Sequence, residues 1–126
     1  MDVSGRLSRI SSDGAEFVLI LRLEDIRWLT GFTGGTAQLL VCTSTHEGWL
    51  LVDGRYFERA TDEIVSSRAS VHIERVVPDV STDEMIARIV GTSSVAVDPT
   101  HLTAHFMTVL QSHCTVVHER TQLDDL

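Results

Sequence analysis

The sequence contains no lysine, only two cysteines and two prolines, and no long apolar run. Its ten basic residues are all arginines, and they are scattered rather than gathered into a patch. Together with eighteen acidic residues they give a net charge of −8. Nucleic acids and anionic membranes are bound largely by clustered cations, so neither is expected as a partner. The apolar runs are also far shorter than the roughly 20 residues that a membrane-spanning helix needs.

Both cysteines, Cys42 and Cys114, lie inside apolar runs. Buried reduced thiols are therefore expected rather than a disulfide. The chain begins without a basic segment that leads into an apolar run, so no signal peptide is evident. Together these observations predict a cytoplasmic location.

The length of 126 residues corresponds to about one domain. A chain of this size buries roughly two thirds of its unfolded surface on folding, so it needs no disulfide or metal for stability. No repeat, low-complexity tract or internal linker is present. We therefore expect a single domain over residues 1–126.

The apolar pattern predicts alternating helices and strands. Strands are expected at 16–21, 36–43, 49–52, 71–76, 94–98 and 114–117. Helices are expected at 2–12, 24–29, 56–65, 81–90 and 99–110. The helix at 81–90 starts with a capping box, Ser81 to Glu84, and ends at Gly91.

The strand at 16–21 is almost continuously apolar, which favours a place at the centre of the sheet. The strands at 36–43 and 49–52 are joined by a short loop with a glycine, which predicts an antiparallel hairpin. The expected fold class is α/β, with a mixed sheet of about six strands flanked by helices.

Two stretches combine glycine, aromatic residues and arginine, at 27–35 (RWLTGFTGG) and at 50–57 (LLVDGRYF). Glycine accepts positive φ angles and close backbone contacts, so both stretches are expected to be turns. The first precedes a strand, whereas the known phosphate-binding loops open a helix, so a tight turn is favoured over a phosphate site. Asp53 is expected to end a strand and to help start the next helix.

Aromatic residues in these stretches are typical of a hydrophobic core. Trp28 and Tyr56, however, carry polar atoms and stand beside glycine turns and an arginine. Because Trp, Tyr and Arg dominate the anchors of protein interfaces, a partly exposed contact surface is the alternative.

Six histidines raise the question of a metal site. His101 and His105 would share a helix face, but the segment between them lacks the glutamate of His-Glu-x-x-His. A third ligand would have to come from His113, Cys114 or His118. Surface or capping histidines are favoured over a zinc site.

Asp53 and Asp98 both lie at predicted strand ends, where sites in open α/β sheets form. They could serve a small hydrolase, although capping of the following helices is favoured. Nucleophilic catalysis has little support, because no serine stands in Gly-x-Ser-x-Gly and both cysteines are expected in the core.

The segments Asp25–Gly34 (DIRWLTGFTG) and Gly48–Tyr56 (GWLLVDGRY), followed by Ala60, identify a family resemblance. They resemble the N-terminal domain of the creatinase, prolidase and aminopeptidase P family, and most closely that of bacterial Xaa-Pro aminopeptidases. Trp28 stands where the family more often has tyrosine, and Gly34-Gly35 replaces a Gly-Ser-like pair.

The resemblance implies a mixed sheet with flanking helices, related to a ribonuclease H-like motif. It also implies that a larger pita-bread catalytic domain, absent from this chain, holds two divalent metals, manganese or cobalt. This chain itself is then expected to hold no catalytic residue and no metal. Its implied role is in oligomerisation and in shaping access to the active site, and its implied partners are its own C-terminal catalytic domain and further copies of the enzyme.

Under this resemblance, residues expected at the access route or an interface are Arg27, Trp28, Phe32, Arg55 and Tyr56. Residues expected to form a structural corner are Gly31, Gly34, Asp53 and Gly54, and Asp53 could pair with Arg55 there. Three alternatives stay open: a stand-alone binding or dimerisation module, the N-terminal domain of a prolidase or creatinase, and a small hydrolase that uses Asp53 and Asp98.

Overall fold

The predicted strands all form, and they join one sheet in the computed structural model, which describes residues 2–12, 14–98 and 104–118. The strands are β1 (Phe17–Ile20), β2 (Gln38–Cys42), β3 (Gly48–Asp53), β4 (Val71–Val76), β5 (Ser94–Val97) and β6 (Thr115–His118). Their order across the sheet is β4-β3-β2-β1-β5-β6. β2 is antiparallel to β1 and β3, and the remaining neighbours are parallel. The expected α/β fold with a mixed six-stranded sheet is confirmed.

β1 lies in the middle of the sheet, as its apolar sequence predicts. All four of its residues are buried, and Val18 pairs with Val41 of β2 on one side and Ala96 of β5 on the other. The β2–β3 hairpin is also confirmed, with Gln38 opposite Leu51. This register places the beginning of β2 and the end of β3 at the same edge of the sheet.

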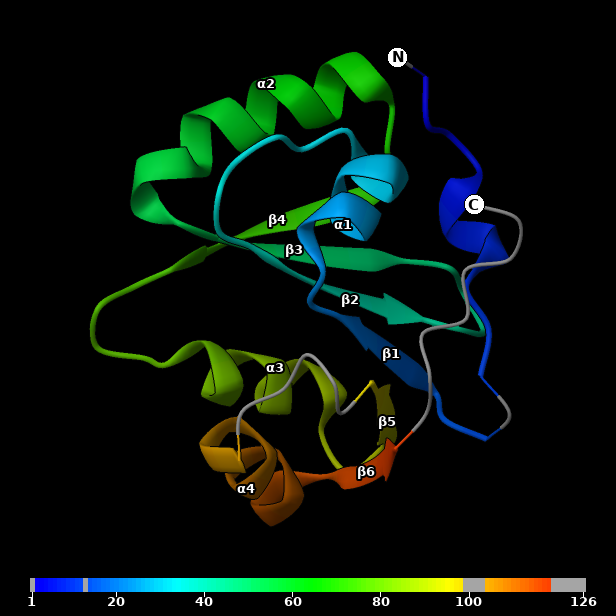
Figure 1. Cartoon of the computed structure of the whole chain (residues 1–126), viewed down its shortest axis with the longest axis vertical. Coiled ribbons are helices and arrows are strands. Elements are labelled where there is room, and N and C mark those ends of the chain that lie inside the picture. The colour runs from blue at the N-terminus through cyan, green and yellow to red at the C-terminus, as the bar shows by residue number, and fades with distance from the viewer. Residues whose placement is uncertain (1, 13, 99–103, 119–126) are drawn as a thin grey trace.

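Helices cover both faces of the sheet (Figure 1). α1 (Leu23–Thr30) and α2 (Phe57–Ser67) lie on one face, and α3 (Thr82–Val90) and α4 (Ala104–His113) lie on the other. Short 3-10 helices occur at η1 (Arg6–Arg9) and η2 (Gly54–Tyr56).

The side chains of β1 alternate between two hydrophobic cores, as the period of a strand requires. Val18 and Ile20 point into the core beneath α1 and α2, whereas Phe17 and Leu19 point into the core beneath α3 and α4. Leu39 and Leu40 divide between the two cores in the same way. The strands are therefore apolar on both faces because the sheet is covered on both.

The prediction of a helix over residues 2–12 is wrong in length. Only Arg6–Arg9 form a short 3-10 helix, although Val3, Leu7 and Ile10 are buried as expected. The Val3 backbone N–H donates to the Ser67 carbonyl at 2.8 Å, so the segment bonds to the end of α2 instead of continuing a helix.

The start and end of α3 agree with the sequence. The Ser81 hydroxyl accepts from the Glu84 backbone N–H at 3.4 Å, and Gly91 follows the last turn. Pro99, the expected first residue of the next helix, lies outside the described residues. In the part of the chain that the structure describes, no helix is both long and apolar enough to cross a bilayer.

Both cysteines are buried free thiols, as predicted. Burial raises the pKa of the Cys114 thiol. For Cys42, burial raises the pKa, but hydrogen bonds with Ser44 and Thr45 outweigh it and lower the pKa below its ordinary value.

Candidate functional site

The two glycine-containing stretches of the sequence meet at one edge of the sheet. The loop that follows α1, residues 31–36, leads into β2, and the corner that follows β3, Asp53–Tyr56, leads into α2. The Phe32 and Tyr56 rings pack edge to face with their centroids 6.1 Å apart. The β2–β3 hairpin brings these stretches together, because its two outer ends lie side by side.

α1 ends at Gly31, which adopts the left-handed conformation with φ of +82°. The Gly31 backbone N–H donates to the Arg27 carbonyl at 2.8 Å. The buried Ser67 hydroxyl donates to the Thr30 carbonyl at 2.6 Å, so the end of α1 is bonded to the end of α2. The expected turn at Gly31 is therefore also a contact between two helices.

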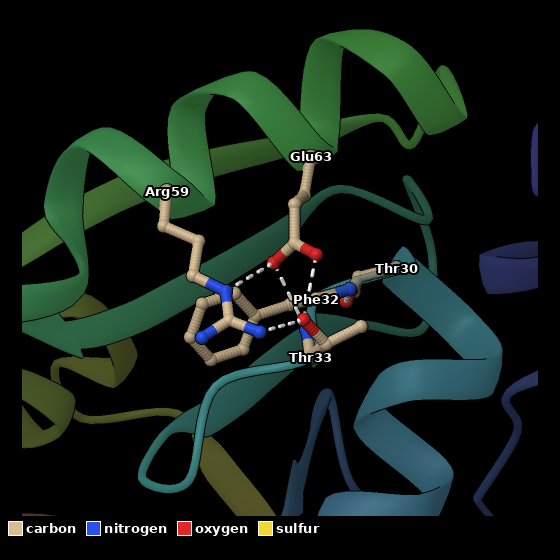
Figure 2. Close-up of polar contacts among 5 residues, drawn as sticks. All are labelled: Thr30, Phe32, Thr33, Arg59 and Glu63. Carbon is tan, nitrogen blue, oxygen red and sulfur yellow. Dashed lines mark hydrogen bonds and ion pairs between the residues drawn. The ribbon is translucent and has the colours of Figure 1, made fainter.

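A second set of contacts binds the loop to α2, and we call Thr33, Arg59 and Glu63 the loop clasp. The Glu63 carboxylate accepts from the Thr33 backbone N–H at 3.0 Å and from its hydroxyl at 2.7 Å. Arg59 pairs with Glu63 at 3.5 Å and donates to the Thr33 hydroxyl. Figure 2 shows both charged side chains reaching from α2 to the loop. The clasp holds the loop in one position relative to α2.

Replacing Glu63 with alanine is expected to lower the free energy of unfolding by about 1.5–3 kcal/mol, the range for hydrogen bonds to a charged group. The side chain is only 24% exposed, so water replaces these bonds poorly. Denaturation with urea measures the change. The matched control is Asp62→Ala, an exposed carboxylate on the same helix, which should change stability by less than about 0.5 kcal/mol. Equal effects of the two substitutions would show that the clasp does not stabilise the domain.

The corner is held by Asp53, which accepts from the Arg55 backbone N–H at 2.8 Å and caps η2. The Arg55 guanidinium pairs with the same carboxylate through two contacts of 3.3 Å. The backbone and side-chain hydrogen bonds from Arg55 lower the pKa of Asp53, and the hydrogen bond with Asp53 raises the pKa of Arg55. The expected pairing and the helix-starting role of Asp53 are both present.

The five residues expected at an access route or interface differ in exposure. Arg27 and Arg55 are exposed, Trp28 and Tyr56 are half-buried, and Phe32 is only 1% exposed. The structure brings Phe32, Arg55 and Tyr56 together, with the Arg55 guanidinium 5.6 Å from the Tyr56 ring centre. Phe32 supports the corner from inside the core and offers almost no surface of its own.

Trp28 lies against the N-terminal segment. The guanidinium groups of Arg6 and Arg9 lie 4.5 and 5.7 Å from its ring centre, and Arg6 also donates to the Trp28 carbonyl at 2.6 Å. Arg27 borders a small hollow together with Gly31, Thr33 and Glu63. Trp28 and Arg27 therefore lie beside contacts that could not be predicted from the sequence.

An open pocket of about 640 Å³ lies at the ends of β3 and β4, next to the start of α3. Its lining residues are Thr36, Gln38, Asp53, Gly54, Arg55, Arg75, Val76, Val77, Pro78 and Thr82. Only the Asp53–Arg55 part was predicted. The remaining lining residues come from three other segments. In the sequence, the one indication of these residues was their position at the carboxyl edge of an α/β sheet, where ligand sites form.

The structure separates the two aspartates of the small-hydrolase hypothesis. β3 and β5 are parallel but have β2 and β1 between them, so the strand ends that carry Asp53 and Asp98 lie about 14 Å apart at ~4.8 Å per strand. The metals of a two-metal site lie only ~3.5–4 Å apart. The arrangement does not fit a shared site at these two residues.

The histidine hypothesis falls largely outside the described residues. His101 is not described, and neither are the side chains of His105, His113 and His118. Among the residues that are described, no three His, Cys, Asp or Glu side chains gather as a metal site requires.

Comparison with protein families gives a match to the Creatinase/Prolidase N-terminal domain over residues 6–126. A search of curated proteins found no significant match.

Several solved structures share the fold. The N-terminal domain of the cytoplasmic peptidase PepQ from Mycobacterium tuberculosis H37Rv is 23% identical with a TM-score of 0.69, over 87% of this chain and 85% of that one. The Creatinase/Prolidase N-terminal domain of an X-Pro dipeptidase from Streptococcus pyogenes is 19% identical with a TM-score of 0.66, over 82% of each chain.

The X-prolyl aminopeptidase of Caenorhabditis elegans, a cytosolic enzyme with a di-nuclear active site, is 22% identical with a TM-score of 0.69. The match covers 96% of this chain but only 22% of the nematode enzyme. The chain thus corresponds in fold to a small part of that enzyme.

Proposed function

Because this chain belongs to the Creatinase/Prolidase N-terminal domain family, we propose that it is the non-catalytic N-terminal domain of a Xaa-Pro aminopeptidase. In this proposal the domain contributes to oligomerisation and shapes access to the active site. A separate catalytic domain in the same protein holds two divalent metals, manganese or cobalt, and supplies the hydrolytic chemistry. The enzyme is placed in the cytoplasm, in keeping with two buried free thiols.

The observation that carries the proposal is the meeting of the two family motifs at one sheet edge. The loop at 31–36 is bonded to α2 by the clasp, and the corner at Asp53–Tyr56 packs on Phe32. This edge therefore combines an ordered backbone with an exposed arginine, Arg55. An exposed arginine on a hydrogen-bonded edge suits a surface that contacts another domain, because arginine is enriched at interfaces.

The extent of the fold match supports the proposal that catalysis belongs to a separate domain. The chain spans 22% of the C. elegans enzyme. The aspartates that could have served catalysis here lie too far apart to share two metals. A catalytic domain elsewhere in the protein accounts for both observations.

A Xaa-Pro dipeptidase is the alternative parent enzyme, because the S. pyogenes domain with the same fold comes from an X-Pro dipeptidase. The two activities differ in the substrate. A Xaa-Pro aminopeptidase hydrolyses the bond before proline in longer peptides and releases the first residue, whereas a Xaa-Pro dipeptidase hydrolyses the same bond in the free dipeptide.

The isolated chain is expected to show no hydrolysis of Xaa-Pro peptides, with or without added manganese. The product of the whole gene, loaded with manganese, is expected to cleave Xaa-Pro-Yaa tripeptides. Release of the first residue is measured by mass spectrometry on both proteins. Metal-dependent turnover by the pure 126-residue chain would contradict the proposal, and cleavage of dipeptides alone by the whole product would favour the dipeptidase.

A further inference from the structure

The open pocket at the ends of β3 and β4 contains an arginine, Arg75, that has no ion-pair partner among the described residues. Asp53 and Arg55 pair with each other through two contacts of 3.3 Å. Among the described residues, no hydrogen bond or ion pair engages the guanidinium of Arg75. The three charged residues of the pocket therefore sum to one positive charge, in a chain whose net charge is −8.

The Arg75 guanidinium lies beside the backbone of the corner. A Cβ atom added to Gly54 would lie 3.2 Å from both Nε and one terminal nitrogen of Arg75. The guanidinium thus lies beside Gly54 and at the pocket, and the residue is exposed to solvent. Since Val52 is opposite Arg75 in the β3–β4 register, the side chain starts close to the end of β3.

The rest of the lining is suited to a ligand with an apolar part. Val76, Val77 and Pro78 provide apolar surface, and Val77 is 42% exposed. Thr36 and Thr82 add hydroxyl groups. A volume of about 640 Å³ lies within the ~300–1,000 Å³ of typical small-molecule sites.

We propose that this pocket binds a carboxylate carried on an apolar body, such as the C-terminal residue of a peptide or an acidic side chain next to an apolar one. Arg75 is the anchor, because a planar guanidinium donates two parallel hydrogen bonds to a carboxylate. The apolar part of the ligand covers Val76, Val77 and Pro78. A cation is disfavoured, because the one carboxylate of the lining, Asp53, is already paired with Arg55.

This inference does not depend on the proposed function. Binding is a property of the domain, whereas the peptidase activity belongs to the whole gene product. The two can therefore fail separately, and the measurement below uses only the 126-residue chain.

The test is an NMR titration of the ¹⁵N-labelled chain with three peptides. The first is N-acetyl-Ala-Leu with a free carboxylate, the second is its C-terminal amide, and the third is N-acetyl-Ala-Glu-Leu amide with an internal acid. We expect the free carboxylate to shift the backbone amides of Gly54, Arg55 and Val77, and the uncharged amide to leave them unchanged. Binding of the third peptide identifies an acidic side chain of a protein segment as a source of the carboxylate, and its failure restricts the site to C-termini.

Arg75→Gln is expected to weaken binding about tenfold or more, because a hydrogen-bonded charged partner is lost. Arg88→Gln on α3 removes the same charge from an exposed residue outside this pocket, and it should leave the affinity unchanged. The same spectra report whether each variant is folded. Unchanged binding in Arg75→Gln, no shift with either carboxylate, or equal shifts with the uncharged amide would each overturn the proposal.

Discussion

Replacing Phe32 with alanine is expected to destabilise the domain by about 3–5 kcal/mol, the usual cost of removing a buried aromatic ring. Phe32 is 1% exposed and belongs to the core beneath α1 and α2. Its ring also fills the space under Gly34, where an added Cβ would come within 2.2 Å of the ring tip. Without the ring, the loop loses its support and Tyr56 loses its edge-to-face partner. Urea denaturation at 25 °C measures the change.

The matched substitution is Phe32→Leu, which keeps apolar volume in the core but removes the aromatic contact with Tyr56. Its expected cost is about 0.5–1.5 kcal/mol, the contribution of an aromatic pair beyond its burial. A cost for Phe32→Ala no larger than that for Phe32→Leu would mean that the loop refills the space. In that case the support that Phe32 gives to the corner would be dispensable.

Replacing Gly31 with alanine is expected to lower stability by about 2–5 kcal/mol. The left-handed conformation of Gly31 costs a non-glycine residue about 1–2 kcal/mol. The new Cβ would also lie 2.8 Å from the Ser67 Cβ and 3.1 Å from its hydroxyl oxygen. Because Ser67 is bonded to the Thr30 carbonyl, it has little freedom to move away. An overpacked contact of this kind adds about 1–3 kcal/mol.

A substitution at Gly5 is the control for the cost of placing alanine in the left-handed conformation. It has almost the same conformation, with φ of 83° and ψ of −7° against 82° and 0° for Gly31, but an added Cβ would meet no atom within 4 Å. Gly5→Ala is therefore expected to cost only about 1–2 kcal/mol. The difference between the two variants, measured by urea denaturation, isolates the contact with Ser67. Equal costs would show that α1 and α2 separate easily at this point.

These two residues support the part of the domain to which the proposed function assigns a role. Phe32 holds the corner from below, and Gly31 lets α1 end directly against α2. A variant that weakens either contact should therefore alter the position of Arg55 and of the pocket beside it. Substitutions at Arg75 act on that pocket alone, because its guanidinium has no partner within the described chain.

Much of the fold could be predicted from local patterns, because burial imposes them directly on the sequence. A strand covered on both faces must be apolar at every position, which identified β1 as central. Ser81 and Gly91 marked both ends of α3, since a helix terminus needs partners for its free backbone groups. The helix predicted over residues 2–12 does not form. The buried residues of this segment follow a helical spacing, but its backbone bonds to the end of α2.

Only part of the candidate site could be predicted from the sequence. The Asp53–Arg55 pair is local, so its two members stand close together in the chain and could be expected from their spacing. Glu63 and Thr33 join two different elements, and Arg75 reaches Gly54 from a neighbouring strand. No periodicity or motif encodes such contacts, because they depend on strand order and register.

The sequence by itself determined the fold class, the central strand, the free thiols and the two glycine turns that carry the family resemblance. Each follows from interactions between near neighbours or from the requirement that apolar residues be buried. The tertiary structure alone decided that the two turns meet, that Asp53 and Asp98 do not, and that Arg75 completes a pocket. The physical reason is the strand order. The β2–β3 hairpin brings the loop and the corner to one edge of the sheet, and β2 and β1 lie between the strands that lead to the two aspartates.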